Sequence, residues 1–264
     1  MPDYKAIFDA IESTLLKVGS RKVPGDEIRT YLDGFKHLEG KSFSDDEYYR
    51  ILVHIVFYSG MKAQTVTAKL PVIDEHFPNF RSVARYGHEE VRKILSDSPQ
   101  RMIRNRNKIR ACVENAKTFT HIVLDHGSFQ NYIDSFGATK SDDNLFRLKE
   151  ELQDRFSGLG GITVYHFLTD IGMPVAKPDR VVSHIFARLG LVERNPKPDS
   201  VVHEARKFAQ ATGHPVRYID IVVASYGHVQ HTEVGLERGI CTEANPSCSI
   251  CGATKYCSYY AQPW

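Results

Sequence analysis

The sequence lacks long apolar runs, an excess of one charge and a secretion signal. No apolar run in its 264 residues approaches the ~18 residues that a membrane-spanning helix needs. Residues 1–22 carry acids within their apolar stretch and no small-residue cleavage site, so no signal peptide is expected. Hydrophobic residues make up 42% and charged residues 25%, which excludes disorder as the default. We expect a cytoplasmic monomer that binds no membrane and has one large domain or two intertwined ones.

The alternation of apolar and polar residues that marks β-strands is also absent, and no repeat of 20–50 residues occurs. Helical spacing is clear instead: Ile7, Ile11 and Leu15 repeat every four residues. Ser44, followed by three acidic residues, predicts the capped start of a helix through 48–59. Further helices are predicted over 64–76, 88–96, 106–124, 143–155, 162–171, 181–190, 199–211 and 215–226. The predicted fold class is all-α, with about ten short helices.

The net charge of +2, from 34 basic and 32 acidic residues, does not by itself indicate a nucleic-acid-binding protein. The charge is unevenly distributed, however. Residues 101–110 read RMIRNRNKIR, with five basic residues and no acid. This stretch is either a solvated helix start or a patch that faces DNA phosphates. In the second case, Arg104 and Arg106 are the candidate phosphate contacts.

Cysteine is scarce and clustered. Cys112 stands alone, and its expected place is a buried helix position. The other four cysteines lie within 241–257, in the segment CTEANPSCSICGATKYC: Cys241, Cys248, Cys251 and Cys257. A disulfide framework suits a small secreted domain and not this chain, so a metal centre is the better interpretation. Zinc sites usually use two separated CxxC pairs, whereas only one such pair is present here. Iron–sulfur clusters also take four cysteines, and both alternatives remain open on the residues alone.

The spacing of six, two and five residues between these cysteines resembles the [4Fe–4S] loop of the endonuclease III branch of the helix-hairpin-helix DNA glycosylases. The resemblance implies a [4Fe–4S] cluster as cofactor, with zinc as the alternative, and double-stranded DNA with a damaged or modified base as partner. In that family the residues between the first two cysteines are basic. Residues 242–247 here read TEANPS, so a structural role for the cluster is implied more strongly than a DNA contact from its loop.

A second segment supports this resemblance. Residues 156–168, FSGLGGITVYHFL, are similar to the glycine-rich hairpin between two helices of that family. Glycines let the backbone approach a ligand closely, and the amides of the following helix can hold a phosphate. The resemblance therefore implies DNA contacts from Gly158, Leu159, Gly160 and Gly161. A plain turn between helices is the alternative.

Residues 170–191, DIGMPVAKPDRVVSHIFARLGL, resemble the segment that carries the catalytic aspartate of the family, which corresponds to Asp179. Asp179 also suits the role of a helix N-cap. A carboxylate at this place would stabilise the oxocarbenium character of a breaking glycosidic bond. Members that also cut the DNA backbone have a lysine that forms a Schiff base, and that position here is Ile162. A monofunctional glycosylase without AP-lyase activity is therefore expected.

Base flipping needs a side chain that fills the vacated position and a pocket that receives the base. Residues 54–70 resemble the helix end that carries the wedge in this family, which makes Met61 the candidate wedge. Tyr58, Tyr165 and His166 are candidates for stacking on the base. Simple packing in the core is the alternative for all of them.

A further resemblance is to 3-methyladenine DNA glycosylase I. It covers 103–119 (IRNRNKIRACVENAKTF), the GSF at 127–129 and 163–173 (TVYHFLTDIGM). Ile55 stands where that group has a glutamate, and the zinc-binding termini of the group are missing. An alkylated purine is the leading substrate. Another modified or mismatched base, including a bulky pyrimidine, and a non-catalytic protein that binds damaged DNA remain alternatives.

Together the resemblances imply two helical lobes. One covers 44–145, and the other combines 1–43 with 146–264. The second lobe would contain the helix-hairpin-helix at about 150–168, the segment with Asp179 and the iron–sulfur loop at 241–257. Asp179 and the hairpin are expected to line the cleft where the flipped base enters.

Overall fold

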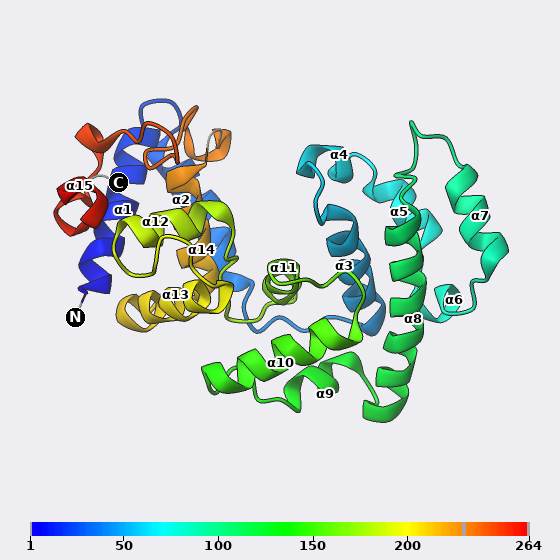
Figure 1. Ribbon diagram of the computed structural model, residues 1–264. Helices are drawn as coiled ribbons and strands as arrows, with labels where there is room; N and C mark the ends of the chain where they lie inside the picture. The colour runs from blue at the N-terminus through cyan, green and yellow to red at the C-terminus, as the bar shows by residue number, and fades with distance from the viewer. Residues whose placement is uncertain (1, 229–230, 263–264) are drawn as a thin grey trace. The chain divides into compact units, whose positions relative to one another are not determined.

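The computed structural model describes residues 2–228 and 231–262, and these residues form no β-strand (Figure 1). An isolated antiparallel bridge joins His231 to Leu236. The all-α fold class is confirmed. The helices are α1 (Tyr4–Gly19), α2 (Gly25–Asp33), η1 (Gly34–His37), α3 (Asp45–Tyr58), α4 (Ala63–Thr67), α5 (Leu70–His76), α6 (Phe80–Val83), α7 (His88–Ser96), α8 (Arg106–His126), α9 (Phe129–Asp134), α10 (Asp142–Arg155), α11 (Thr163–Asp170), α12 (Arg180–Arg188), α13 (Pro198–Thr212), α14 (Val216–Gly227), η2 (Thr232–Val234), η3 (Cys248–Ile250), η4 (Thr254–Tyr256) and α15 (Ser258–Ala261).

The caps read from the sequence are present. The Ser44 hydroxyl accepts a hydrogen bond from the amide of Glu47, whose carboxylate accepts one from the amide of Ser44. This reciprocal pair satisfies two amides that the first turn of α3 leaves open. The single helix predicted over 64–76 is wrong in detail, because it divides into α4 and α5. Pro71 in the first turn of α5 has no N–H to continue the ladder of α4. None of the helices of the described residues is long and apolar enough to cross a membrane.

The chain divides into two compact units. Unit 1 combines Met1–Lys41 with Gly172–Trp264, and unit 2 is Ser42–Ile171. The glycine-rich hairpin thus belongs to unit 2, whereas the sequence grouped it with the C-terminal half, beginning at residue 146. The reason is packing: α11, which follows the hairpin, lies against α3 and α10 of unit 2. Such tertiary contacts leave no periodic signal in the sequence.

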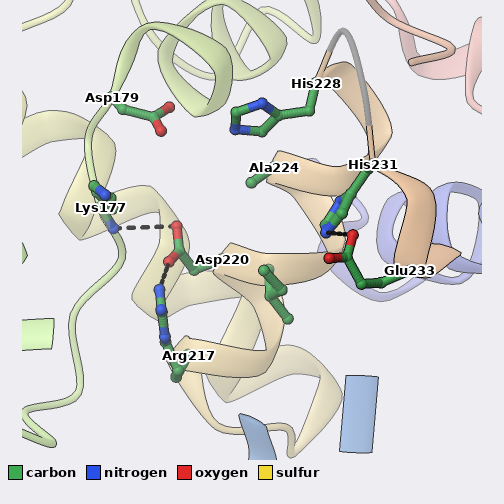
Figure 2. Close-up of a pocket in the computed structure, with 9 residues that line it drawn as sticks. Lys177, Asp179, Arg217, Asp220, Ala224, His228, His231 and Glu233 are labelled. Atoms are coloured by element: carbon green, nitrogen blue, oxygen red, sulfur yellow. Dashed lines mark hydrogen bonds and ion pairs between the residues drawn. The ribbon is translucent and has the colours of Figure 1, made fainter. Parts of the chain in front are cut away.

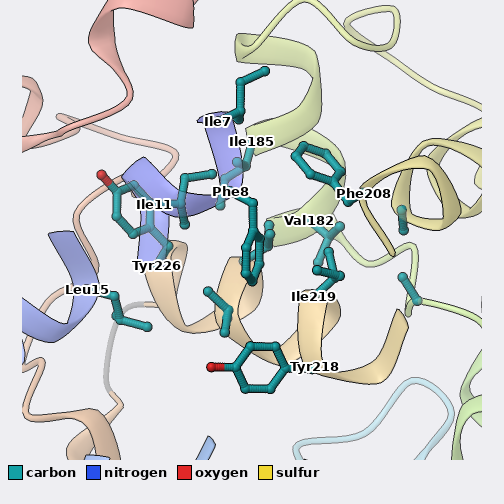
Figure 3. Packing of buried hydrophobic residues seen from close by; sticks show 14 of the residues in the cluster. Ile7, Phe8, Ile11, Leu15, Val182, Ile185, Phe208, Tyr218, Ile219 and Tyr226 are labelled. Atoms are coloured by element: carbon teal, nitrogen blue, oxygen red, sulfur yellow. The ribbon is translucent and has the colours of Figure 1, made fainter. Parts of the chain in front are cut away.

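Helix α14 forms the centre of unit 1. Helices α1, α12 and α13 all pack against it, and their apolar side chains interlock around it (Figure 3). From α1 the four-residue spacing predicted from the sequence brings Ile7, Ile11 and Leu15 into this core. Because α14 is covered on several sides, it is apolar nearly throughout, and a charged residue within it needs a special environment.

Unit 2 is built on α8, which packs against α3, α6, α7 and α9. An aromatic cluster fills the space between these helices, and Phe119 stacks on Phe129 with ring centroids 4.4 Å apart. Helix α8 ends at His126, where Gly127 has a φ of 80° that other residues rarely adopt. The lone Cys112 is 0% exposed on this helix, in agreement with the buried position expected for it.

The basic stretch 101–110 separates into two kinds of residue. Arg104 and Arg106 are exposed. Lys108 is half-buried, and its ammonium group donates hydrogen bonds of 2.6 Å each to the carbonyl oxygens of Val56 and Ser59. These carbonyls belong to the last turn and the C-cap of α3, where helices leave acceptors unsatisfied. Burial lowers the pKa of Lys108. This lysine therefore joins α8 to the end of α3 and does not act as a free surface charge.

Lys108→Met is expected to lower the free energy of unfolding by about 1–3 kcal/mol, because two carbonyl groups lose their charged donor. Urea unfolding followed by circular dichroism measures this loss. Arg110→Met is the matched control, since Arg110 is exposed on the same helix and the change should have little effect. Equal stabilities of the two variants would show that Lys108 does not hold the end of α3.

Candidate active site

Asp179 lines a polar pocket of about 320 Å³ that lies within unit 1 (Figure 2). The segment before α12 supplies Lys177 and Asp179, and α14 supplies most of the floor. The lining residues are Lys177, Asp179, Arg217, Asp220, Ile221, Ala224, His228, His231 and Glu233. This pocket combines two cationic side chains, three carboxylates and two histidines. Catalytic acids, bases and charge-stabilising groups are typically found in pockets of this kind.

Asp179 is held in place by the helix that follows it. It is the N-cap of α12, and its Oδ1 accepts hydrogen bonds from the amides of Val181 at 2.8 Å and Val182 at 3.0 Å. The predicted capping role is therefore confirmed. These bonds occupy one carboxylate oxygen, and the half-buried side chain faces the pocket with His228 across from it (Figure 2). A fixed carboxylate at a pocket wall can stabilise a positive charge that develops in front of it.

A second carboxylate, that of Asp220 on α14, lines the same pocket as Asp179. It is 3% exposed and accepts hydrogen bonds from the Lys177 amide at 3.1 Å and from the Arg217 guanidinium. Burial raises the pKa of Asp220 to about 6; the Arg217 guanidinium opposes this shift and the Asp179 carboxylate adds to it. Neither Asp220 nor Arg217 was predicted from the sequence as a site residue. The available signal was a lone acid between Ile219 and Ile221 in an apolar helix.

The opposite wall of the pocket is formed by histidines and an acid. His231 Nε2 lies 3.1 Å from the Tyr31 hydroxyl and 3.7 Å from Glu233 Oε2, whereas its Nδ1 is buried without a hydrogen-bond partner. Burial lowers the pKa of His231, so the neutral ring is favoured. His228, at the end of α14, is exposed. None of these residues was identified from the sequence, because no local pattern places them beside Asp179.

The glycine-rich hairpin connects α10 to α11 in unit 2. Gly158 has a φ of 92°, and a Cβ there would lie 3.1 Å from Val56, so this position requires glycine. Leu159 is 2% exposed and serves as an anchor rather than a direct DNA contact. No atom lies within 4 Å of a Cβ built on Gly160 or Gly161. These two glycines therefore leave the backbone before α11 open to a ligand.

A buried asparagine fixes this hairpin to α8. Asn115 is 1% exposed; its Nδ2 donates to the Ser157 carbonyl at 2.9 Å, and its Oδ1 accepts from the Ser157 amide at 2.8 Å. The Ser59 and Thr163 hydroxyls lie 3.4 Å apart and add a contact to the end of α3. Asn115 therefore holds both the amide and the carbonyl of Ser157, which fixes the position of the turn closely. Asn115 was not predicted from the sequence as part of the site, because its partner is 42 residues away.

The candidate wedge and the candidates for stacking on the flipped base differ in their exposure. Met61 is half-buried in the turn after α3, where its amide bonds to the Tyr58 carbonyl at 3.1 Å. The half-buried Tyr58 directs its hydroxyl to Thr67 at 2.8 Å. Tyr165 is 0% exposed on α11, so packing accounts for it and its position does not support a stacking role. His166, also on α11, is half-buried.

The cysteine loop wraps against α1, α12 and α14 of unit 1. Burial raises the pKa of Cys241 to about 11; the Arg188 guanidinium opposes this shift, and the nearby thiols of Cys251 and Cys257 add to it. Cys248 and Cys251 act in the same direction on Cys257. Cys251 and Cys257 therefore lie near Cys241, and Cys248 and Cys251 lie near Cys257. No group of three or more His, Cys, Asp or Glu side chains in 2–228 and 231–262 is arranged to hold a single metal ion.

Hydrogen-bond donors lie beside two of these sulfur atoms. Tyr226 donates its hydroxyl to Cys251 Sγ at 3.0 Å, and Arg188 Nη1 lies 3.3 Å from Cys241 Sγ. Arg188 also donates to the carbonyls of Thr242 at 2.8 Å and Glu243 at 2.6 Å. Donors of this kind stabilise sulfur that carries negative charge, as metal-bound thiolates do. Four thiols with charged and phenolic donors fit an anionic iron–sulfur centre.

Comparisons with known proteins agree with the fold. The family model described as methyladenine glycosylase matches residues 37–184, more than half of the chain. The 8-oxoguanine DNA glycosylase of Thermotoga maritima is 19% identical with a TM-score of 0.52, and the match covers 82% of this chain and 95% of that one. The 3-methyladenine DNA glycosylase I of Staphylococcus aureus is 21% identical with a TM-score of 0.45, and 54% and 84% are covered.

The helical fold and the matched family define a DNA N-glycosylase, an enzyme that hydrolyses N-glycosyl bonds. The chain belongs to the methyladenine glycosylase family. The matched segment contains the hairpin and Asp179 and ends at residue 184, before the cysteine loop. Of the two resemblances seen in the sequence, the partial one to 3-methyladenine DNA glycosylase I is therefore the one that the family comparison confirms. The endonuclease III resemblance of the cysteine loop stays a prediction.

Proposed function

We propose that this enzyme removes an alkylated purine such as 3-methyladenine from duplex DNA, with Asp179 as the catalytic carboxylate. The observation that carries the proposal is the position of Asp179, which α12 fixes at the wall of a polar pocket. In the reaction the bond between C1′ and the base nitrogen breaks, and its electron pair leaves with the base. Asp179 stabilises the positive sugar that results. Water then adds to C1′ and gives up one proton to Asp179 or solvent, which leaves an abasic site.

An alkylated purine suits this pocket chemically. Alkylation at a ring nitrogen gives the base a positive charge, so it leaves as a neutral molecule and needs little acid catalysis. His231, whose pKa is lowered, is mainly neutral at physiological pH and does not repel a cation. Asp179, Asp220 and Glu233 add carboxyl groups to the same pocket. These three carboxylates outnumber the two cationic side chains of the pocket, Lys177 and Arg217. The balance of charge therefore favours the cationic base and the cationic sugar over their neutral counterparts.

DNA would be held by backbone amides at Gly160 and Gly161 and by the exposed side chains of Arg104 and Arg106. The support is the open space beside both glycines and the exposure of both arginines. Met61 remains the candidate wedge. Phosphate contacts of this kind position the duplex and provide no sequence specificity.

We also infer that Cys241, Cys248, Cys251 and Cys257 hold a [4Fe–4S] cluster. The support is the spacing of the four cysteines and the hydrogen bonds that Tyr226 and Arg188 donate to the sulfur atoms of Cys251 and Cys241. Zinc is the alternative. When bound, a cluster would link the four cysteines of the loop to one another and so fix the fold of the loop. Hydrogen bonds then hold the loop to α1, α12 and α14.

Release of bases from a panel of duplexes tests the proposed function. Each duplex carries one lesion: 3-methyladenine, 7-methylguanine, 8-oxoguanine or a mismatched base. We expect release of the methylated purines and an abasic product that alkali cleaves. Binding without release of any base would favour a protein that only recognises damaged DNA.

Borohydride is expected to trap no covalent complex between the enzyme and lesion-bearing DNA. Ile162 occupies the position of the Schiff-base lysine, and its exposed side chain has no amine. The pocket does contain Lys177, which makes the experiment a demanding one. Denaturing gels after borohydride treatment give the result, with a known bifunctional glycosylase as positive control. Trapping that Lys177→Met abolishes would contradict the monofunctional assignment and identify the amine.

A further inference from the structure

Asp220 is the most buried charged group of the pocket. It lies on α14, yet one of its hydrogen bonds comes from the segment that carries Asp179, and the other comes from Arg217 on α14 itself. Oδ1 accepts from the Lys177 amide at 3.1 Å, two residues before Asp179, and the Arg217 guanidinium bonds to Oδ2 (Figure 2). A carboxylate that is 3% exposed in an apolar helix is costly unless these partners hold it. Neither the cap of α12 nor the packing of α14 requires an acid at this position.

Resting on the proposed function, we propose that Asp220 is a positioning residue for Asp179: in its ionised form it anchors the turn at 177–179 to α14 and so aims the Asp179 carboxylate at the sugar. Lys177 and Asp179 belong to one short turn, in which the Asp179 amide bonds to the Lys177 carbonyl at 2.7 Å. Because Asp220 holds the amide of Lys177, a displacement of Asp220 would shift this turn and with it Asp179. Displacements of about 1 Å at a reacting group can cost roughly 100-fold in rate.

Protonation would weaken this anchor. A neutral carboxylic acid accepts hydrogen bonds less strongly and loses its ion pair with Arg217. Since burial raises the pKa of Asp220 to about 6, the anchor is complete above this pH and is lost as the pH falls through it. An alkylated purine already carries its positive charge, so the base needs no proton. A fall in rate near pH 6 would therefore originate in the protein.

Other groups near Asp220 could also contribute to a pH profile. Asp179 and Lys177 face it from the segment before α12. Arg217 lies on the same helix, and His228 caps the end of that helix. Glu39, after η1, accepts from the Arg217 amide at 2.7 Å, and burial raises its pKa. His231 and Glu233 complete the pocket wall. Histidines ordinarily titrate near pH 6.5, so His228→Asn is needed to separate its contribution from that of Asp220.

Single-turnover release of methylated purines from duplex DNA treated with dimethyl sulfate, at pH 5 to 8, tests the proposal. Asp220→Asn should reduce the rate at pH 7.5 by roughly 10- to 100-fold, to a level near the low-pH rate of the wild type. Its profile should lack the fall near pH 6, whereas His228→Asn should keep it. Glu204→Gln is the matched control, a buried carboxylate of unit 1 that does not line the pocket, and should behave as wild type.

Arg217→Gln provides an independent test, in particular if Asp220→Asn does not fold. Loss of the guanidinium raises the proton affinity of Asp220, so the fall in rate should move to higher pH. A wild-type profile in either folded variant would overturn the positioning role. If the wild type releases purines and Asp179→Asn does not, such a result leaves the proposed function intact. If the wild type releases no base, the proposed function and this inference fail together.

Discussion

Asp179→Asn is expected to slow base release by roughly 10²- to 10³-fold, the usual effect of removing one group that stabilises transition-state charge. The substitution removes the negative charge and keeps the shape of the side chain. Asparagine is as good an N-cap as aspartate, and its Oδ1 can accept the same two bonds from Val181 and Val182. The fold should therefore be unchanged, so that the loss reports chemistry.

Single-turnover release of methylated purines at pH 7.5 measures the effect, and thermal unfolding checks the fold. Asp3→Asn is the matched control, because Asp3 also caps a helix of unit 1 and its side chain accepts from the Ala6 amide at 3.0 Å. This variant should release bases at the wild-type rate. Undiminished release by Asp179→Asn would remove the carboxylate from the mechanism.

Asp179 could be found in the sequence because its surroundings are local. The proline before it and the apolar helix after it form one continuous pattern over residues 170–191, and the same few residues determine the cap. Asp220 could not be found in this way. Its significance comes from a bond to Lys177, 43 residues earlier, which exists only once α14 packs beside α12. A sequence pattern reports periodicity and capping and contains no information on such pairings.

The hairpin shows the same limit. The sequence predicted a glycine-rich turn at 158–161, and Gly158 does require glycine because of its positive φ and its contact with Val56. The assignment of the hairpin to a lobe was wrong, since α11 packs on α3 and α10. Asn115 fixes the turn from α8 through a bond that spans 42 residues. The basic stretch likewise contained one structural lysine, Lys108, which composition could not distinguish from its exposed neighbours.

If the proposed [4Fe–4S] cluster is bound, Cys251→Ser is expected to abolish its visible absorption and to lower the melting temperature by ~10 °C or more, which corresponds to a few kcal/mol for a chain of this size. The loop has little regular structure of its own and depends on contacts with three helices. The Gly252 amide donates to Thr14 on α1 at 3.1 Å, and Arg188 and Tyr226 reach it from α12 and α14. Without the cross-links of the cluster, these bonds must hold the loop alone.

The stability and the activity of Cys251→Ser together test whether the proposed cluster has a structural role. Asp179 receives its cap from α12, and α12 is held to the loop by Arg188 and by the His184 bond to the Cys241 carbonyl at 2.6 Å. Loss of the cluster should therefore loosen α12 and displace Asp179. The folded fraction of Cys251→Ser should release bases more slowly than the wild type for this reason. Cys112→Ala is the control: Cys112 is buried in unit 2, so the variant should lose some stability while the cluster absorption remains. A soluble, colourless Cys251→Ser enzyme with wild-type melting temperature and activity would contradict the structural role, because nothing would then depend on the cross-links.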